Sequence, residues 1–171
     1  EALEYTLKIK IADIESTSSE VTNAAYYQEI VLKISKTAEK KKESVLLTNV
    51  KDWIFTFMTG VENSASNSVA GTGTNDVATN GVPFWLTVYF KEVKNVTGVQ
   101  TTHWGAGYAP SKVEIFSSEN GDDWVSIGQW DTKGRTQTIT FDERVKTRYL
   151  KYQMITVPSR VDITRFYIYA W

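Results

Sequence analysis

The sequence predicts an all-β chain, and three observations lead to that prediction. Apolar and polar residues alternate along several short segments, which is the pattern of a strand with one buried face. No window of ten or more residues shows the periodicity of an amphipathic helix. Six Trp, nine Tyr and seven Phe are spread along the 171 residues, and aromatic side chains favour strands.

The predicted strands follow one another at short intervals. In chain order they cover residues 5–11, 30–35, 84–90, a segment ending near 101, 112–117, a segment around 127, 138–141, 150–154 and 166–171. Segment 84–90 is apolar or aromatic on both faces, so both of its faces should be largely covered. The sequence Glu119-Asn120-Gly121-Asp122 predicts a tight hairpin turn, because Asn-Gly tolerates positive φ, and 131–134 predicts another turn. This arrangement is typical of an antiparallel sandwich or barrel.

Two polar stretches interrupt the strands. The charge run at 39–43 lies within a predicted linker, 37–44, and divides the chain into an N-terminal β segment, 1–44, and a β-sandwich domain, 45–171. Residues 62–81 are rich in Asn, Ser, Thr and Gly and predict a long loop. Long ordered loops on β scaffolds commonly carry binding residues.

Composition and charge exclude several classes of function. Nineteen Lys and Arg against 20 Asp and Glu give a net charge of −1, so we expect no nucleic-acid partner. No apolar run approaches the roughly 20 residues that cross a bilayer, so we expect no membrane insertion. Cysteine is absent and His103 is the single histidine, which excludes disulfides, Cys-based zinc sites and two-imidazole sites. We therefore predict no metal centre.

Catalytic patterns are poorly represented, and we expect that the chain is not an enzyme. The acidic pairs Asp122-Asp123 and Asp142-Glu143 fall in predicted turns, where solvated acids are common. There is no Gly-x-Ser-x-Gly elbow, and Gly71-Thr72-Gly73-Thr74 lacks the Lys that a phosphate-binding loop requires.

The segment from 103 to 110 is the most informative part of the sequence. It places His103, Trp104 and Tyr108 among glycines in a loop between two predicted strands. Aromatic rings bind the apolar faces of sugars, while a few polar groups bind the hydroxyls. In this interpretation Trp104 and Tyr108 stack on a sugar, and hydroxyls are bound by His103 and by Asn63, Asn67 or Asn75. The alternative is that Trp104 packs on the core and His103 bonds a nearby carbonyl. Trp85 and Trp124 are predicted to be core residues.

Several motifs, in a fixed order, resemble one known family. They are PFWLTV at 83–88, VTGV at 96–99, APSKVEIFSS at 109–118, NGDDW at 120–124, ITF at 139–141, VKTRYLK at 145–151 and the final segment 163–169. From about residue 53 to 171 this order resembles the discoidin, or coagulation factor 5/8 type C, domain, a group that includes the family 32 carbohydrate-binding modules. The resemblance implies a galactose-binding-like jelly-roll β-sandwich that binds its ligand, without catalysis, in loops at one end.

The chain departs from this family at its last strand. Family members usually carry there a Glu that helps to hold a structural calcium, and the matching residue is Arg165. An arginine does not ligate a cation and its charge opposes one. We therefore expect no cofactor, no calcium at that position, and a pairing of Arg165 with Asp76.

Residues 1–36 are similar to a remnant of the small β domain that precedes such modules in bacterial surface lipoproteins of glycan-utilisation systems. This implies an exported protein at the bacterial cell surface or in the periplasm, anchored to the outer membrane by a segment outside this chain. The expected partners are a glycan and a protein of a surface complex. Two alternatives remain: an adhesion module that uses the same loops to bind a protein, and an accessory domain of a glycoside hydrolase.

Overall fold

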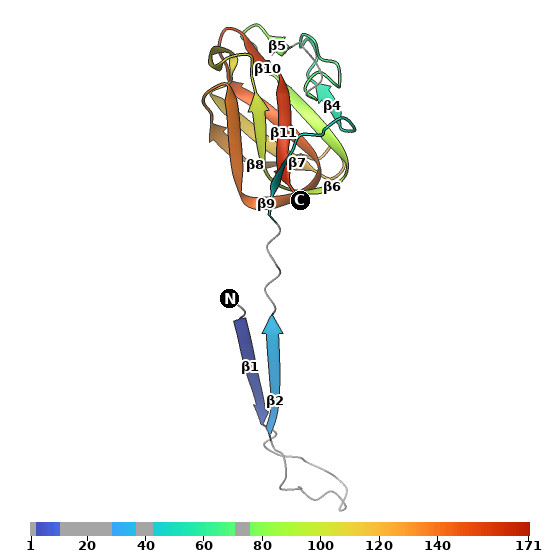
Figure 1. The fold of residues 1–171 in the computed structure, drawn as a ribbon, viewed down its shortest axis with the longest axis vertical. Coiled ribbons are helices and arrows are strands. Elements are labelled where there is room, and N and C mark those ends of the chain that lie inside the picture. The colour runs from blue at the N-terminus through green and yellow to red at the C-terminus, as the bar shows by residue number, and fades with distance from the viewer. Residues whose placement is uncertain (1–2, 11–28, 37–42, 71–75) are drawn as a thin grey trace, which may run out of the picture. The chain divides into compact units, whose positions relative to one another are not determined.

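The chain divides into two compact units, Glu1–Lys42 and Glu43–Trp171. A computed structural model describes residues 3–10, 29–36, 43–70 and 76–171 (Figure 1). In the first unit, β1 (Leu3–Lys10) pairs with β2 (Glu29–Lys36) in an antiparallel two-stranded sheet. A sheet of two strands is only marginally stable by itself in water.

The second unit contains the remaining strands, and every pair among them is antiparallel. They are β3 (Val45–Leu47), β4 (Ile54–Phe57), β5 (Val77–Thr79), β6 (Trp85–Thr102), β7 (Lys112–Ser118), β8 (Val125–Asp131), β9 (Thr136–Thr156), β10 (Val161–Ile163) and β11 (Arg165–Ala170). The strand order is β3-β11-β6-β9-β7-β8, with β4 also pairing with β6, and β5 and β10 form a separate small sheet. The all-β prediction is confirmed, since the described residues contain no α-helix and one 3-10 turn.

The long strands β6 and β9 connect the two layers of the sandwich. Their pairing is interrupted between Tyr89 and Lys94, and Lys91 within this interruption has a φ of 64°. β4 pairs with the first half of β6, whereas β11 pairs with the second half. The two halves therefore belong to different layers. The two halves are predicted as separate strands, because the alternation of apolar residues stops at the bend.

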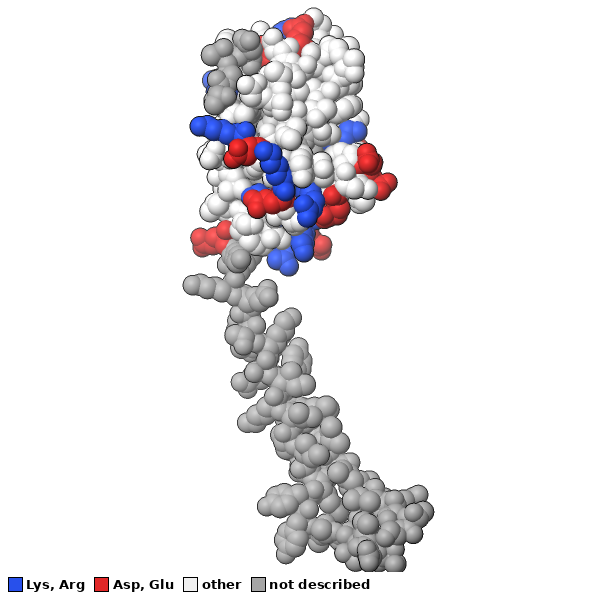
Figure 2. All heavy atoms as spheres, turned by 90° about the vertical axis from the view of Figure 1, so that its right-hand side faces the viewer, with Lys and Arg blue, Asp and Glu red and all other residues white. Residues whose placement is uncertain are grey.

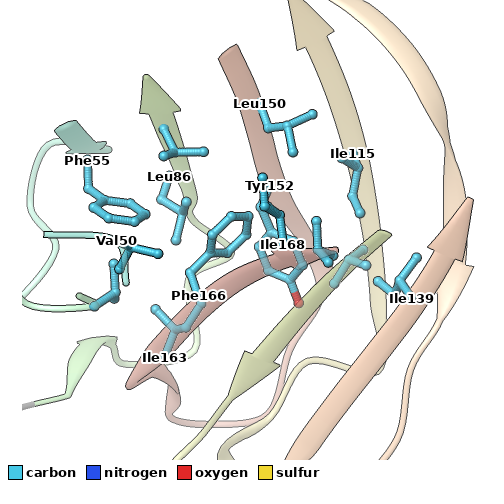
Figure 3. Close-up of a cluster of buried hydrophobic side chains, with 14 of the residues drawn as sticks. Val50, Phe55, Leu86, Ile115, Ile139, Leu150, Tyr152, Ile163, Phe166 and Ile168 are labelled. Atoms are coloured by element: carbon cyan, nitrogen blue, oxygen red, sulfur yellow. The ribbon is translucent and has the colours of Figure 1, made fainter. Parts of the chain in front are cut away.

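The hydrophobic core lies between the two layers (Figure 3). Phe166 lies near its middle, with its ring edge-on to Phe55 and Tyr152 at centroid distances of 6.1 and 5.9 Å. Gly98 lets β6 approach β9, because a Cβ at this position would lie 2.3 Å from the carbonyl oxygen of Ile139. Close pairing of β6 with β9 and the aromatic contacts of Phe166 thus hold the sandwich together.

The predicted hairpin turn is present between β7 and β8, where Gly121 has a φ of 86°. The three- and four-residue strands β3, β4, β5 and β10 are missing from the prediction, because so few residues show no clear alternation. No helix in the part of the chain that the structure describes is long and apolar enough to cross a membrane. Figure 2 shows a face of the second unit on which basic and acidic side chains are intermixed toward one end.

Candidate functional site

The loop that follows β6 is held in place by backbone hydrogen bonds to two other segments. His103 N donates to Arg135 O at 2.9 Å, and Arg135 Nε donates back to His103 O at 3.1 Å. Trp104 N donates to the Asp162 carboxylate at 3.0 Å. The chain then forms the short 3-10 turn Ala106–Tyr108 before entering β7. These contacts fix the backbone of the loop while leaving its aromatic side chains free.

Trp104 and Tyr108 project into solvent beside a shallow hollow. Their side chains are 63% and 40% exposed, which excludes the alternative in which Trp104 packs on the core. The hollow has a volume of about 190 Å³ and is lined by these two rings together with Asp76, Arg160 and Asp162. Aromatic and charged side chains therefore line the same hollow.

Arg160 is oriented by three acceptors. One guanidinium nitrogen donates to Glu62 at 3.0 Å and to Asp76 at 3.4 Å, and the other terminal nitrogen donates to Asn80 at 3.2 Å. The hydrogen bond and charge of Glu62 raise the pKa of Arg160 above its usual value. A guanidinium has five N–H donors, so this arrangement leaves donors for a ligand.

His103 lies beneath the hollow and is fully buried. Its Nδ1–H donates to the carbonyl oxygen of Asp162 at 2.5 Å, and its Nε2 accepts from the Thr101 hydroxyl at 3.1 Å. Burial lowers the pKa of His103 to about 4, so the imidazole is neutral at pH 7. The prediction that His103 binds sugar hydroxyls is wrong, because the ring is inaccessible. Its hydrogen bond instead ties the backbone of Asp162 to the loop, in agreement with the alternative that His103 bonds a nearby carbonyl.

Asp162 is the electrostatically unusual group of the site. Its Oδ1 accepts from Trp104 N, whereas Oδ2 is buried without a hydrogen-bond partner among the described residues. Burial raises the pKa of this carboxyl to about 6, against the opposing effects of the Trp104 N–H and the Arg160 charge. A buried acceptor that lacks a partner is costly, so the ionised form of Asp162 is disfavoured in the folded chain.

Of the predicted asparagines, Asn63 and Asn67 are described by the structure and do not line the hollow. Asn63 donates from its side chain to the carbonyl oxygen of Asp76 at 2.9 Å, and so holds Asp76 in position. Asn67 is exposed and accepts through its backbone carbonyl from Ala70 N at 3.1 Å. Asn75 lies outside the described residues. Arg160 and Asp162 are absent from the predicted site. The one available sequence signal for them is a basic and an acidic residue just before the last predicted strand.

The predicted partner of Asp76 is also corrected by the structure. Arg165 donates to the carbonyl oxygen of Thr164 at 2.8 Å, and the cation beside Asp76 is Arg160 instead. Among the described residues no group of three or more His, Asp or Glu side chains could hold a metal ion.

Comparison with known proteins assigns the second unit to a family. The family model of the F5/8 type C domain matches residues 56–166. No curated protein sequence matches the chain. Among solved structures, the family 32 carbohydrate-binding module of Clostridium perfringens NanJ, in complex with galactose, is 20% identical with a TM-score of 0.58. That comparison covers 74% of this chain and 98% of that one.

Two further solved structures are similar in fold. CBM32-1 from a family 31 glycoside hydrolase of Clostridium perfringens is 19% identical with a TM-score of 0.57, covering 71% of this chain and 96% of that one. A two-domain protein of unknown function from Bacteroides fragilis is 16% identical with a TM-score of 0.58, covering 97% of this chain and 59% of that one.

Proposed function

Because the chain belongs to the F5/8 type C domain family, we propose that it is a non-catalytic carbohydrate-binding module whose glycan occupies the hollow beside Trp104. Two of the similar structures are family 32 carbohydrate-binding modules, and one of these is in complex with galactose. Trp104 and Tyr108 would stack on the apolar face of a sugar. Arg160 and Asp76 would bind its hydroxyls, and the buried Asp162 would hold the backbone of Trp104 in place.

The observation that carries this proposal is the exposure of Trp104 on a fixed loop. Trp104 is 63% exposed, so most of its surface is available to a ligand, and its backbone N–H is held by Asp162. Because the backbone of the loop is already fixed, a ligand that stacks on the ring restricts only the side chain of Trp104. Sugars offer apolar C–H faces to such rings and hydroxyls to the charged groups that line the same hollow.

The proposed affinity for a single sugar is modest. Each stacked ring contributes about 1 kcal/mol beyond the area that it buries, and the hollow is small and open. We therefore expect dissociation constants in the micromolar to millimolar range for a monosaccharide. Longer glycans would bind more tightly only if they make contacts beyond the hollow.

The cellular setting that we propose is the bacterial surface or periplasm, where the module would hold glycans for a surface complex. This rests on the similarity of residues 1–36 to the small β domain of glycan-utilisation lipoproteins, with 45–171 as the binding domain. A second setting is favoured by one comparison, because CBM32-1 comes from a family 31 glycoside hydrolase. The sequence of the full-length gene product distinguishes these settings.

Substitution of Trp104 tests the function. The full chain is applied to a glycan array and titrated calorimetrically with galactose, alongside Trp104→Ala and the control Val45→Ala. Val45 is an exposed apolar residue of β3 that does not line the hollow. We expect Trp104→Ala to weaken glycan binding at least about tenfold and Val45→Ala to leave it unchanged. A wild-type chain that binds no glycan would favour the adhesion role instead.

A further inference from the structure

The outer face of one layer of the sandwich carries aromatic side chains where a solvated sheet usually carries polar ones. Along the first half of β6 the buried residues Leu86 and Val88 alternate with the outward-facing Trp85, Thr87 and Tyr89. The neighbouring strand β9 alternates in the same way between 149 and 154. The prediction that Trp85 is a core residue is therefore wrong, because its half-buried ring lies on the outer face.

This face contains a second hollow, separate from the one beside Trp104. It has a volume of about 430 Å³, which lies within the usual range of ligand pockets. The side chains that define it are Trp85, Thr87, Asp122, Trp124, Tyr149 and Lys151. The two hollows share no lining residue. Trp124, also predicted as core, is half-buried and forms part of the wall.

One wall of this outer-face hollow is fixed by close packing. The ring of Tyr149 stacks on Tyr89 with centroids 4.5 Å apart and an interplanar angle of 14°. Gly121 lies against the same ring, and a Cβ at this position would come within 3.1 Å of it. Because Gly121 also has a φ of 86°, only glycine fits this contact without strain.

The turn that presents Asp122 and Trp124 is equally fixed. The Asn120 side chain accepts from the backbone N–H groups of Asp122 and Asp123, each at 2.9 Å. The Ser118 hydroxyl accepts from Gly121 N at 2.9 Å. These hydrogen bonds fix the backbone of the turn from which the Trp124 side chain projects. This part of the hollow is therefore formed before any ligand binds.

Lys151 supplies a hydrogen-bond donor on the floor. Its ammonium lies 5.3 Å from the ring centroid of Trp85 and 5.5 Å from that of Phe116. The strand register places Lys151 between Thr87 on β6 and Phe116 on β7. It forms no hydrogen bond or ion pair with another described side chain, so its N–H groups are available to a ligand.

We propose that the outer-face hollow is a second saccharide site, which holds a segment of a neutral glycan against Trp124 and Trp85. The rings offer stacking surfaces, and Lys151, Thr87 and Asp122 offer donors and acceptors for hydroxyls. A neutral ligand fits because this set contains one base and one acid. The class of ligand, though not the site itself, rests on the proposed function. Two sites on one module would strengthen binding to a polysaccharide by avidity.

The test separates the two sites by substitution in the full chain. Wild type, Trp104→Ala, Trp124→Ala and the double variant are titrated with neutral cello-, xylo-, manno- and galacto-oligosaccharides, from tetra- to hexasaccharides. Affinity is measured by calorimetry, and the indole N–H resonances are followed by NMR. The control is Val125→Ala, next to Trp124 but 68% exposed and outside the hollow.

We expect Trp104→Ala to retain binding to at least one oligosaccharide, with a shift of the Trp124 indole resonance. Adding Trp124→Ala should weaken that binding at least about tenfold, and Val125→Ala should not. If Trp104→Ala abolishes all binding and the Trp124 resonance never moves in the wild type, the second site is refuted while the proposed function stands. If only Trp124→Ala weakens binding, the proposed end site fails and the second site stands.

The binding of Thr87→Arg and the oligomeric state of the chain test the second site independently. Should Trp124→Ala not fold, Thr87→Arg fills the same hollow from its floor, and it must weaken the residual binding by a similar factor. Unchanged binding in Thr87→Arg would refute the site. If the wild type is a dimer that Trp124→Ala converts to a monomer, the face is an interface between two copies and the saccharide assignment is wrong.

Discussion

Replacement of Asp162 by Asn removes a buried charge while keeping the hydrogen bond that holds the loop. The Asn carbonyl oxygen can still accept from Trp104 N, as the Asp162 carboxylate does at 3.0 Å. Burial raises the pKa of Asp162 from 3.8 to about 6 in the folded chain. Its environment includes Asp76, whose charge raises the pKa further, and Arg160, whose charge opposes the rise. The neutral form is therefore favoured by folding.

The magnitude follows from that difference. The pKa of Asp162 rises by about two units on folding, and each unit corresponds to about 1.4 kcal/mol. The ionised carboxylate therefore destabilises the folded state by about 3 kcal/mol. The buried amide of Asn leaves N–H donors without an acceptor, which costs about 1 kcal/mol. We expect Asp162→Asn to be more stable than the wild type by about 2 kcal/mol at pH 7 to 8. The cost is absent below about pH 4, so the gain disappears there.

His103 produces the opposite pH dependence. Burial lowers its pKa from 6.5 to about 4, so the stability that its neutral form contributes is lost as pH falls through this range. In the wild type the two effects oppose each other between about pH 4 and 6. In Asp162→Asn the effect of His103 remains alone, and stability should fall by about 3 kcal/mol on acidification from pH 6.5 to 4.

Urea unfolding from pH 4 to 8 measures both effects. The control is Asp131→Asn, an exposed acid at the end of β8 whose loss should change little. If Asp162→Asn is less stable than the wild type at pH 8, the charged carboxylate stabilises the fold. In that case the contacts with Trp104 N and Arg160 outweigh burial, and the reasoning is refuted.

Three further predictions concern the site and its frame. Arg160→Met should weaken glycan binding about tenfold in calorimetry but lower the unfolding free energy by less than about 1 kcal/mol, since its ion pairs are exposed. Gly98→Ala should cost about 3 kcal/mol or more in urea unfolding because of the 2.3 Å approach to the Ile139 carbonyl, whereas Gly107→Ala, with open space around it, should be nearly neutral. Phe166→Ala should cost about 3 to 5 kcal/mol in the same assay, and a loss below 1 kcal/mol would contradict its central place in the core.

The strands that the sequence predicts are those with several alternations of apolar and polar residues. The outward and inward faces of 84–90 and 150–154 follow from this alternation, although aromatic residues on both faces hide which rings are exposed. Gly121 in the β7–β8 turn is predicted because Asn-Gly has a local conformational preference. The short strands β5 and β10 are invisible to periodicity, yet they bring Asp162 beside the segment that follows Asp76.

The amino-acid sequence by itself determined that this chain is a cysteine-free, nearly neutral all-β protein with Trp104 and Tyr108 in one loop, since composition, alternation and turn residues are local properties. Only the tertiary structure decided which polar groups join those rings. Asp76, Arg160 and Asp162 meet through the antiparallel pairing of β5 with β10, a contact between segments far apart in the chain. The tertiary structure also decided that His103 is buried, because the exposure of a side chain depends on the segments that pack around it and not on its neighbours in sequence.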